Sequence, residues 1–271
     1  MRSVACCIAM LAVCAQAQER TVIHLGDAPL ARSIAPGETH TFEIDLQAGD
    51  VLRVRVEQGD INLGVAIRGA GGQELSAANN SGASDVEFVS ALAPLAGRYE
   101  IEVKPVSTAT APGDYKVAVQ EAGPASDRGR ALVEGDRLFT LANTRRNAGT
   151  AQANRDAIQG FAEAREKYVA ADEPWRIAES WNRIGVAQLA LNEHGNALAS
   201  FDATRVIVDR IGDRRWQGVL LNNIGLAHWN LSEVTEALDA HREALAIRRE
   251  VGDKFGEASS LLNTALVYRG I

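Results

Sequence analysis

The chain has 271 residues, with 28 lysines and arginines against 35 aspartates and glutamates, so its formal net charge at neutral pH is −7. This acidic balance comes without a basic stripe, which argues against nucleic acid as a partner. A chain of this length is expected to form about two domains. All three cysteines, Cys6, Cys7 and Cys14, lie near the N-terminus, so the rest of the chain has no disulfide framework.

The first residues are typical of an export signal. Arg2 precedes an apolar run from Val4 to Val13, and Ala15-Gln16-Ala17 matches an A-x-A cleavage site. Because the run is too short to span a bilayer, residues 1–17 are predicted to be a signal peptide that is cleaved after Ala17. A lipoprotein signal that uses Cys14 is the alternative. The mature protein is therefore expected to be periplasmic or secreted.

In residues 20–122, apolar side chains alternate with polar ones. The four clearest runs are Phe42–Leu46, Leu52–Val56, Tyr99–Val103 and Tyr115–Val119. This period of two predicts strands with one buried and one solvated face, which places Arg53 on the solvated side. Turn-forming pieces such as Gly69–Gly72 separate the strands. Seven or eight short strands of this kind predict an antiparallel β-sandwich with a jelly-roll-like arrangement.

The order of these pieces resembles the bacterial pre-peptidase C-terminal domain. The resemblance rests on Ala48-Gly49-Asp50-Val51-Leu52, on Ala96-Gly97-Arg98-Tyr99 and on Gly113-Asp114-Tyr115. It implies a sandwich that accompanies secreted enzymes, of which some members bind calcium or polymers. Near the expected loop end only Asp60 and Asp85 could bind a hard cation, and no acidic cluster surrounds them, so no metal site is predicted.

Residues 126–174 are expected to hold an adaptor helix and a degenerate first helical unit. Ser126 or Asp127 can cap a helix that runs to about Arg146. A second helix is expected from about Gln152 to Ala170, and Pro174 suits the first turn of the next one.

Residues 175–271 repeat one pattern every 40 residues. The recurring small and bulky positions are Trp181, Ile184, Gly185, Ala197 and Phe201, then Leu221, Ile224, Gly225, Ala237 and His241, then Leu261, Thr264 and Ala265. The small residues are expected where the two helices of a unit cross, because larger side chains would force the backbones apart. Gly212-Asp213 and Gly252-Asp253 recur at the same period and suit a left-handed helix end followed by a helix cap. Ala157 and Phe161 extend the pattern backward by one period.

These recurring positions resemble the pattern of tetratricopeptide repeats, W-x2-L-G-x2-Y followed by A-x3-F, in the longer variant of kinesin-light-chain-like arrays. It implies an all-α solenoid of helical hairpins. With its signal and sandwich, the chain resembles the N-terminal half of bacterial tetratricopeptide proteins that end in a CHAT domain, a caspase-like peptidase module. The third copy departs from the pattern because it stops at Ile271 after one helix. The residues then expected to face solvent, unless the chain is a fragment or a partner covers them, are Leu261, Leu262, Leu266 and Val267.

No catalytic, cofactor or metal site is predicted in the mature chain. A caspase-like site needs a thiolate and a histidine, and the mature chain has no cysteine. The histidines are scattered, and His228 and His241 occupy repeat positions that usually hold packed aromatic rings. No histidine or cysteine pair has the spacing of a zinc site.

The first helices of successive units are expected to line a concave groove. Its candidate residues are Asn182, Arg183, Asn222, Asn223, Trp229 and Asn263. Rows of asparagine can hold a peptide backbone, since each amide both donates and accepts, and Trp229 can supply an apolar anchor. Alternatively, the asparagines bond neighbouring helices and Trp229 belongs to the core between repeats.

The sequence therefore favours a non-enzymatic scaffold that binds a protein or peptide, with no nucleic acid, membrane span or cofactor. One alternative is the regulatory front part of a secreted CHAT peptidase whose catalytic domain lies beyond Ile271. Another is a sandwich that binds calcium or an envelope polymer.

Overall fold

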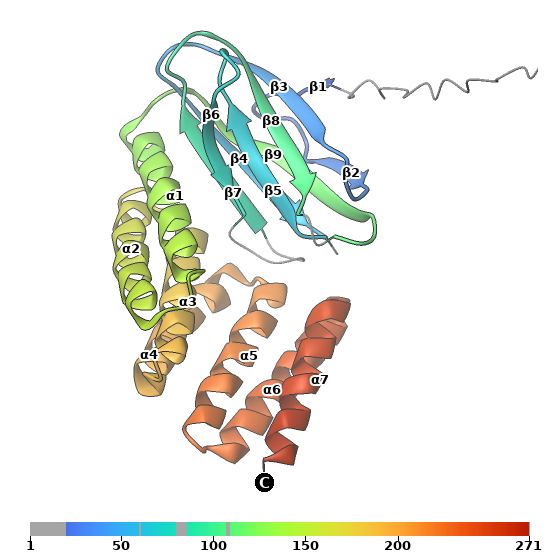
Figure 1. Cartoon of the computed structure of the whole chain (residues 1–271), viewed down its shortest axis with the longest axis vertical. Coiled ribbons are helices and arrows are strands. Elements are labelled where there is room, and N and C mark those ends of the chain that lie inside the picture. The colour runs from blue at the N-terminus through green and yellow to red at the C-terminus, as the bar shows by residue number, and fades with distance from the viewer. Residues whose placement is uncertain (1–19, 60, 80–85, 107–108, 271) are drawn as a thin grey trace, which may run out of the picture.

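The computed structural model describes residues 20–59, 61–79, 86–106 and 109–270, which form nine strands followed by seven helices (Figure 1). The strands are β1 (Arg20–Val22), β2 (Leu30–Ile34), β3 (His40–Leu46), β4 (Asp50–Gln58), β5 (Leu63–Arg68), β6 (Glu74–Ala78), β7 (Val86–Leu92), β8 (Gly97–Pro105) and β9 (Gly113–Pro124). The helices are α1 (Asp127–Arg146), α2 (Ala151–Ala170), α3 (Pro174–Ala190), α4 (His194–Ile211), α5 (Arg214–Asn230), α6 (Val234–Glu250) and α7 (Lys254–Arg269). The predicted signal peptide, Asp60 and Asp85 lie outside the described residues.

The strands form two packed sheets, as the alternating pattern predicted. One sheet has the order β1-β3-β8-β5-β6 and the other β2-β9-β4-β7. Neighbouring strands are antiparallel except β1, which runs parallel to β3. The core between the sheets contains the inward side chains of the predicted runs, such as Phe42, Leu52, Ile101 and Tyr115, each at most 2% exposed. The fold is an antiparallel β-sandwich followed by a tetratricopeptide-like helical solenoid.

The outer face of β4 differs from the prediction. Arg53 was expected in solvent but is only 2% exposed, because α1 packs across β4 and β7. Glu43 on β3 is also buried, and it forms ion pairs with Arg20 and Arg98. The alternation of apolar and polar residues therefore predicted the strands correctly. It did not predict that a helix, α1, covers the outer face of one sheet.

The helices form the hairpins α1/α2, α3/α4 and α5/α6, and α7 is the first helix of a further unit. The predicted caps are present. Ser126 accepts a hydrogen bond from the Gly129 amide at 3.0 Å, and Asp213 accepts one from the Trp216 amide at 3.0 Å. Gly212 and Gly252 have φ angles of 74° and 71°, the left-handed conformation that glycine adopts at low cost. These caps end one unit and begin the next at the same point of each repeat.

The two complete 40-residue repeats cross in the same way. A Cβ added to Gly185 would lie 2.5 Å from Cε1 of Phe201, and one added to Gly225 would lie 2.6 Å from Cε1 of His241. Glycine is needed at both places because the ring rests on the backbone of the first helix. The alanines of the second helices, Ala197 and Ala237, are fully buried. By contrast Ala265 on α7 is exposed, since no helix of the described chain packs on it.

The surface of α7 agrees with the sequence analysis except at one residue. Leu261, Leu262 and Leu266 are 45%, 61% and 37% exposed, as expected. Val267 was expected in solvent but is 1% exposed. It is buried because it lies on the side of α7 that packs against α5 and α6.

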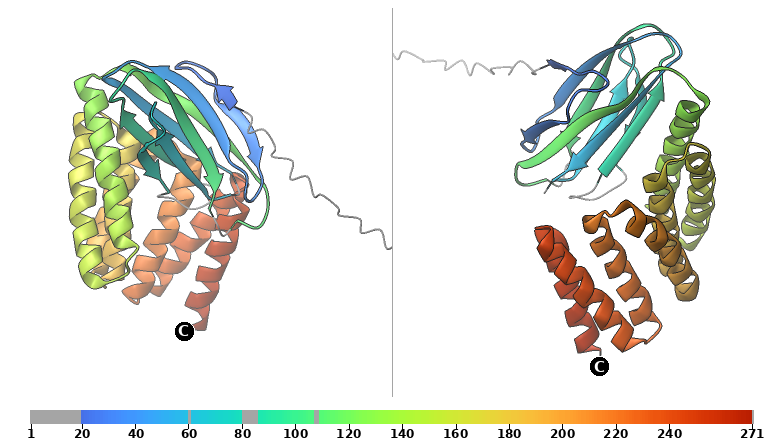
Figure 2. Two further views of the ribbon diagram at one scale, coloured as in Figure 1. Left: turned by 45° about the horizontal axis from the view of Figure 1, so that its top comes forward. Right: turned by 180° about the vertical axis from the view of Figure 1, so that it is seen from behind.

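The sandwich sits at one end of the helical stack, with α1 lying along its side (Figure 2). None of the described helices has both the length and the apolar character needed to cross a membrane.

Candidate functional site

Asparagines join the first helices of successive units. Nδ2 of Asn223 on α5 donates to Oδ1 of Asn182 on α3 at 3.0 Å, and Nδ2 of Asn263 on α7 donates to Oδ1 of Asn222 on α5 at 2.9 Å. Each pair spans 41 residues, so the same hydrogen bond is made one repeat later. We call these two bonds the asparagine rungs. They hold α3, α5 and α7 side by side on one face of the solenoid.

The rungs place the predicted groove asparagines in interhelical contacts. Asn182 and Asn222 are 7% exposed, whereas Asn223 and Asn263 are half-buried. Each rung uses one of the two N–H groups of the donor amide and one lone pair of the acceptor oxygen, so polar capacity remains on both partners. The structural role that the sequence left as an alternative is therefore present, and a binding role stays a prediction.

The other two groove candidates also make contacts inside the fold. Nη2 of Arg183 lies 3.4 Å from Oε1 of Glu179, one turn away on α3. Trp229 is half-buried, and a Cβ added to Gly270 would lie 2.3 Å from Cη2 of its ring, so the indole packs on the end of α7. Arg183 is thus tied to an ion-pair network, and Trp229 contacts the next repeat.

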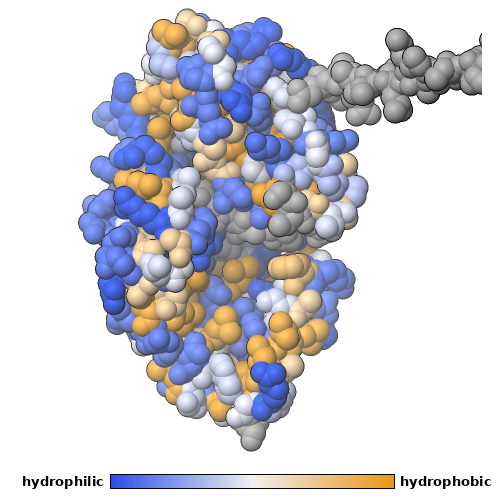
Figure 3. Space-filling view, in the orientation of Figure 1, coloured by the Kyte–Doolittle hydropathy of each residue, from blue (hydrophilic) through white to orange (hydrophobic). Residues whose placement is uncertain are grey.

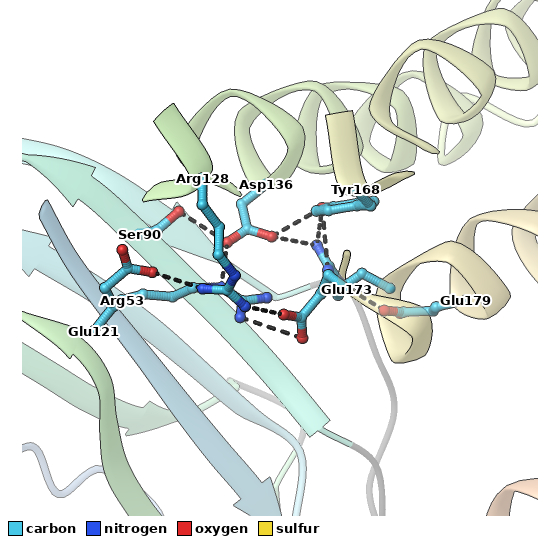
Figure 4. A network of polar contacts seen from close by, with 9 residues as sticks. Arg53, Ser90, Glu121, Arg128, Asp136, Tyr168, Glu173 and Glu179 are labelled. Carbon is cyan, nitrogen blue, oxygen red and sulfur yellow. Dashed lines mark hydrogen bonds and ion pairs between the residues drawn. The ribbon is translucent and has the colours of Figure 1, made fainter. Parts of the chain in front are cut away.

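A buried carboxylate, which the sequence analysis missed, lies where the sandwich meets the helices (Figure 4). Asp136 of α1 is 3% exposed and accepts hydrogen bonds from Arg53 Nε at 3.2 Å and Ser90 Oγ at 2.8 Å, both from the sandwich. On its other side Tyr168 Oη donates at 2.8 Å and Arg176 Nη2 at 3.0 Å. One side chain therefore joins β4, β7, α1, α2 and α3.

The charges of this junction are balanced. Burial by itself would raise the pKa of Asp136, but Arg176 and Arg53, together with the two hydroxyl donors, hold that pKa below its ordinary value. Arg176 is 1% exposed and also pairs with Glu179, while its guanidinium lies 4.1 Å from the ring centroid of Phe139. The two buried cations thus face two buried carboxylates, as burial of charge requires.

Weaker ion pairs and a row of rings extend the junction outward. Glu173 lies 3.4 Å from Arg53 and 2.9 Å from Arg128. The aromatic centroids of Phe88 on β7 and Trp175 on α3 are 5.4 Å apart, and those of Trp175 and Trp216 on α5 are 5.2 Å apart with nearly parallel planes. These three rings form a continuous row of aromatic contacts from β7 of the sandwich through α3 to α5.

A charged cleft of about 670 Å³ lies below the sandwich, between β2, β4, β9 and the start of α5. Its cationic lining residues are Arg32, Arg55, Lys116 and Arg215. Figure 3 shows the molecule hollowed between the sandwich and the lower helices. No three histidine, cysteine, aspartate or glutamate side chains of the described residues come close enough together to hold a metal ion.

One family model matches a part of the chain. A tetratricopeptide repeat model matches residues 219–251. No curated protein matches the chain. Among solved structures, the chain is similar to aspartyl phosphate phosphatase F from Bacillus subtilis, with 15% identity and a TM-score of 0.48 over 51% of this chain and 35% of that one.

Two further solved structures cover one part of the chain each. A tpr-like protein from Chlorobium tepidum has 16% identity and a TM-score of 0.44 over 52% of this chain and 99% of that one. The pre-peptidase C-terminal domain of a collagenase from Bacillus anthracis has 15% identity and a TM-score of 0.32 over 39% of this chain and 98% of that one. The segment that matches the tetratricopeptide repeat model covers most of α5 and all of α6.

Proposed function

We propose that this protein is a non-catalytic scaffold that binds an extended peptide segment of a partner protein along the face formed by α3, α5 and α7. The observation that supports this proposal is the register of the asparagine rungs. Because the same bond recurs after one repeat, equivalent side chains form rows across the three helices. The tetratricopeptide repeat at residues 219–251 supports a protein as the partner.

The chemistry of the rows suits a peptide backbone. Asn223 and Asn263 are half-buried and keep a second N–H group and an accepting oxygen outside the rungs. An extended peptide presents alternating N–H and C=O groups that such amides can pair with, with little dependence on the peptide's side chains. The half-buried ring of Trp229 offers an apolar contact beside them.

Short random peptides displayed on phage and selected on the full chain test the proposal. Selected peptides should bind the Asn223→Ala, Asn263→Ala double variant about tenfold or more weakly, because two hydrogen bonds to the backbone are lost. The control is Asn196→Ala, at an exposed asparagine of α4 whose amide donates to the exposed Glu193. Equal affinity for the double variant and the control would contradict the groove.

We also propose that the protein acts in the cell envelope or outside the cell, supported by the signal-like residues 1–17. Fractionation of the producing cell, with mass spectrometry of the mature N-terminus, tests this. We expect a chain that begins at Gln18. An intact N-terminus in the cytoplasm would contradict the location.

A second candidate is the recognition part of a CHAT-type peptidase, favoured by the order of signal, sandwich and repeats. The catalytic histidine and cysteine would then be encoded after codon 271. The coding sequence beyond that codon tests the idea, and a nearby stop codon would contradict it.

A further inference from the structure

The charged cleft between the sandwich and α5 has the size of a ligand site. α1 packs on β4 and β7, and the cleft of about 670 Å³ opens beside it, between β2, β4, β9 and the start of α5. Pockets that bind small ligands have volumes in this range. We call this space the domain cleft, and its charged lining residues are the cations Arg32, Arg55, Lys116 and Arg215 and the acids Glu57, Asp114 and Asp213.

The strand register explains the wall that the sandwich contributes. Ala31 of β2 lies opposite Lys116 of β9, and Lys116 lies opposite Glu57 of β4. Because side chains alternate along a strand, these residues point away from the sandwich core. Ala31 and Ser33 are both small and exposed, so β2 leaves the charged groups of the next two strands open to the cleft.

The cleft begins where the aromatic contact between the two domains ends. Trp175 of α3 packs on Phe88 of β7, with ring centroids 5.4 Å apart. Arg215 follows Trp175 by one period of the repeat, and Arg55 lies directly opposite Phe88 in the sheet. One repeat along the solenoid and one strand across the sheet, two rings in contact are therefore replaced by two arginines that line the cleft.

The charges of the cleft leave one cation in excess, although the whole chain has a net charge of −7. Arg55 and Lys116 share one carboxylate, since Arg55 contacts Glu57 and Nζ of Lys116 lies 4.0 Å from it. Arg215 is half-buried, and among the residues that the structure describes no carboxylate pairs with it. Like charges on opposite walls are stabilised when an anion lies between them.

We propose that the domain cleft binds a ligand through one carboxylate group, held between the guanidinium groups of Arg215 and Arg55. A guanidinium fits a carboxylate with two parallel hydrogen bonds. One carboxylate also matches the excess of one positive charge, whereas a phosphate would bring up to two negative charges close to Asp114 and Asp213. The carboxylate can belong to a free small acid or to an acidic side chain of a peptide.

This site goes beyond the proposed peptide groove and does not depend on it. None of the groove asparagines lines the domain cleft, and one of its two walls belongs to the sandwich. A ligand held there would contact both domains at once.

An NMR titration of the isotope-labelled full chain, followed at the arginine Nε–Hε resonances, tests the proposal. The probes are N-acetylglycine, a free acid with one carboxylate, and the peptide acetyl-Gly-Gly-Glu-Gly-Gly-amide, whose only charge is its glutamate. We expect the Arg215 and Arg55 resonances to shift in a saturable way, and the glutamine analogue of the peptide to leave them unchanged. Tighter binding of the peptide would assign the carboxylate to a peptide, and equal affinities would assign it to a free acid.

Four variants connect the binding to the cleft. Arg215→Gln and Arg55→Gln should each weaken it about tenfold or more, because a charge-assisted hydrogen bond is lost from one wall. Asp114→Asn should strengthen it about twofold or more, because an acid is removed from the lining. Arg155→Gln removes the same charge from the exposed side of α2 and should leave the affinity unchanged.

Arg215→Gln should keep the circular dichroism spectrum of the parent, since Arg215 is half-buried and has no ion pair within the described part of the chain. The absence of a saturable shift with both probes would overturn the proposal. Equal affinity of Arg215→Gln and Arg155→Gln would overturn it as well. So would inorganic phosphate that binds the cleft more tightly than either probe, because the charge match would then be wrong.

Discussion

Polar side chains are buried in two places, at the junction of the sandwich with the helices and at the crossing of α5 with α6. The two places differ in whether the buried polar atoms have hydrogen-bond partners. Asp136 at the junction has four hydrogen-bond donors around it. His241 at the crossing is 0% exposed, and neither of its ring nitrogens has a hydrogen-bond partner in the described part of the chain. The difference teaches that burial alone does not tell whether a polar group holds a fold together or weakens it.

The shape of the two sites explains this contrast. The junction joins segments far apart in the chain, and paired charges fix their relative position. The crossing needs only a flat ring on the backbone of Gly225, and Phe201 fills the same place on Gly185 without polar atoms. Histidine meets the shape requirement of the repeat at the cost of two unpaired nitrogens.

The largest expected effect is at the junction. Asp136→Ala leaves Arg53 and Arg176 buried without their shared carboxylate, which should lower the free energy of unfolding by about 3–5 kcal/mol. Chemical denaturation followed by circular dichroism measures it. Glu134→Ala, on the exposed side of the same helix, is the matched control and should change stability by less than about 1 kcal/mol. A loss at Asp136 no larger than at Glu134 would refute the role of the network.

The next effect is a pH dependence from His241. Its burial, with a smaller contribution from the charge of Arg248, lowers the pKa of the imidazole from 6.5 to about 4. Between these values the unfolded chain binds more protons than the folded one, so stability falls as pH drops from 6.5 toward 4. We expect a loss on the order of 2–3 kcal/mol, since one pKa unit corresponds to about 1.4 kcal/mol.

His241→Phe checks the origin of this pH dependence. It should raise stability at neutral pH and remove most of the loss between pH 6.5 and 4. The paired carboxylate of Asp136 does not interfere, because its pKa lies below the ordinary 3.8 and its stabilisation is lost only at lower pH. An unchanged pH profile in His241→Phe would show that another group titrates.

A smaller effect is expected at the neighbouring crossing, where the fit is tight but apolar. Gly185→Ala puts a Cβ 2.5 Å from the Phe201 ring, and such overpacking should cost about 1–3 kcal/mol. Gly195→Ala in α4 is the control, since a Cβ there meets no atom within 4 Å. Helix propensity alone should make that change neutral or stabilising by up to about 1 kcal/mol. Thermal unfolding distinguishes them, and the same sign for both would argue against the crossing.

The smallest effect is expected for one rung. Asn223→Ala removes the bond to Asn182 and should cost about 1 kcal/mol, the net contribution of a typical hydrogen bond. Asn196→Ala, at an exposed bond on α4, should cost less. A loss of several kcal/mol at Asn223 would mean that this residue is mainly structural and would weaken the case for the groove.

Much of the solenoid could be predicted because its contacts repeat at a fixed distance along the chain. Glycine recurs after 40 residues at Gly185 and Gly225, which predicted the helix crossings. It recurs in the same way at Gly212 and Gly252, which predicted the helix ends. Val267 was placed in solvent because the sequence does not show which side of α7 the preceding unit covers.

The junction could not be found in this way. Arg53 and Asp136 are 83 residues apart, and their contact does not recur from one repeat to the next. Arg53 fits the solvated side of an alternating strand, and only the packing of α1 shows otherwise. One signal was present. Gly129 lies on the face of α1 that carries Asp136, and a Cβ added to it would lie 3.1 Å from Cγ2 of Val51 on β4.

A double-mutant cycle between Gly185 and Phe201 tests the stacking of the helices most directly. Gly185→Ala, Phe201→Leu and the double variant are compared in chemical denaturation. If the ring rests on the glycine backbone, Phe201→Leu makes room for the new methyl group, and the double variant should be more stable than the sum of the two losses predicts by about 1 kcal/mol or more. Additive losses would mean that the two residues do not touch, and would contradict the crossing on which the repeat is built.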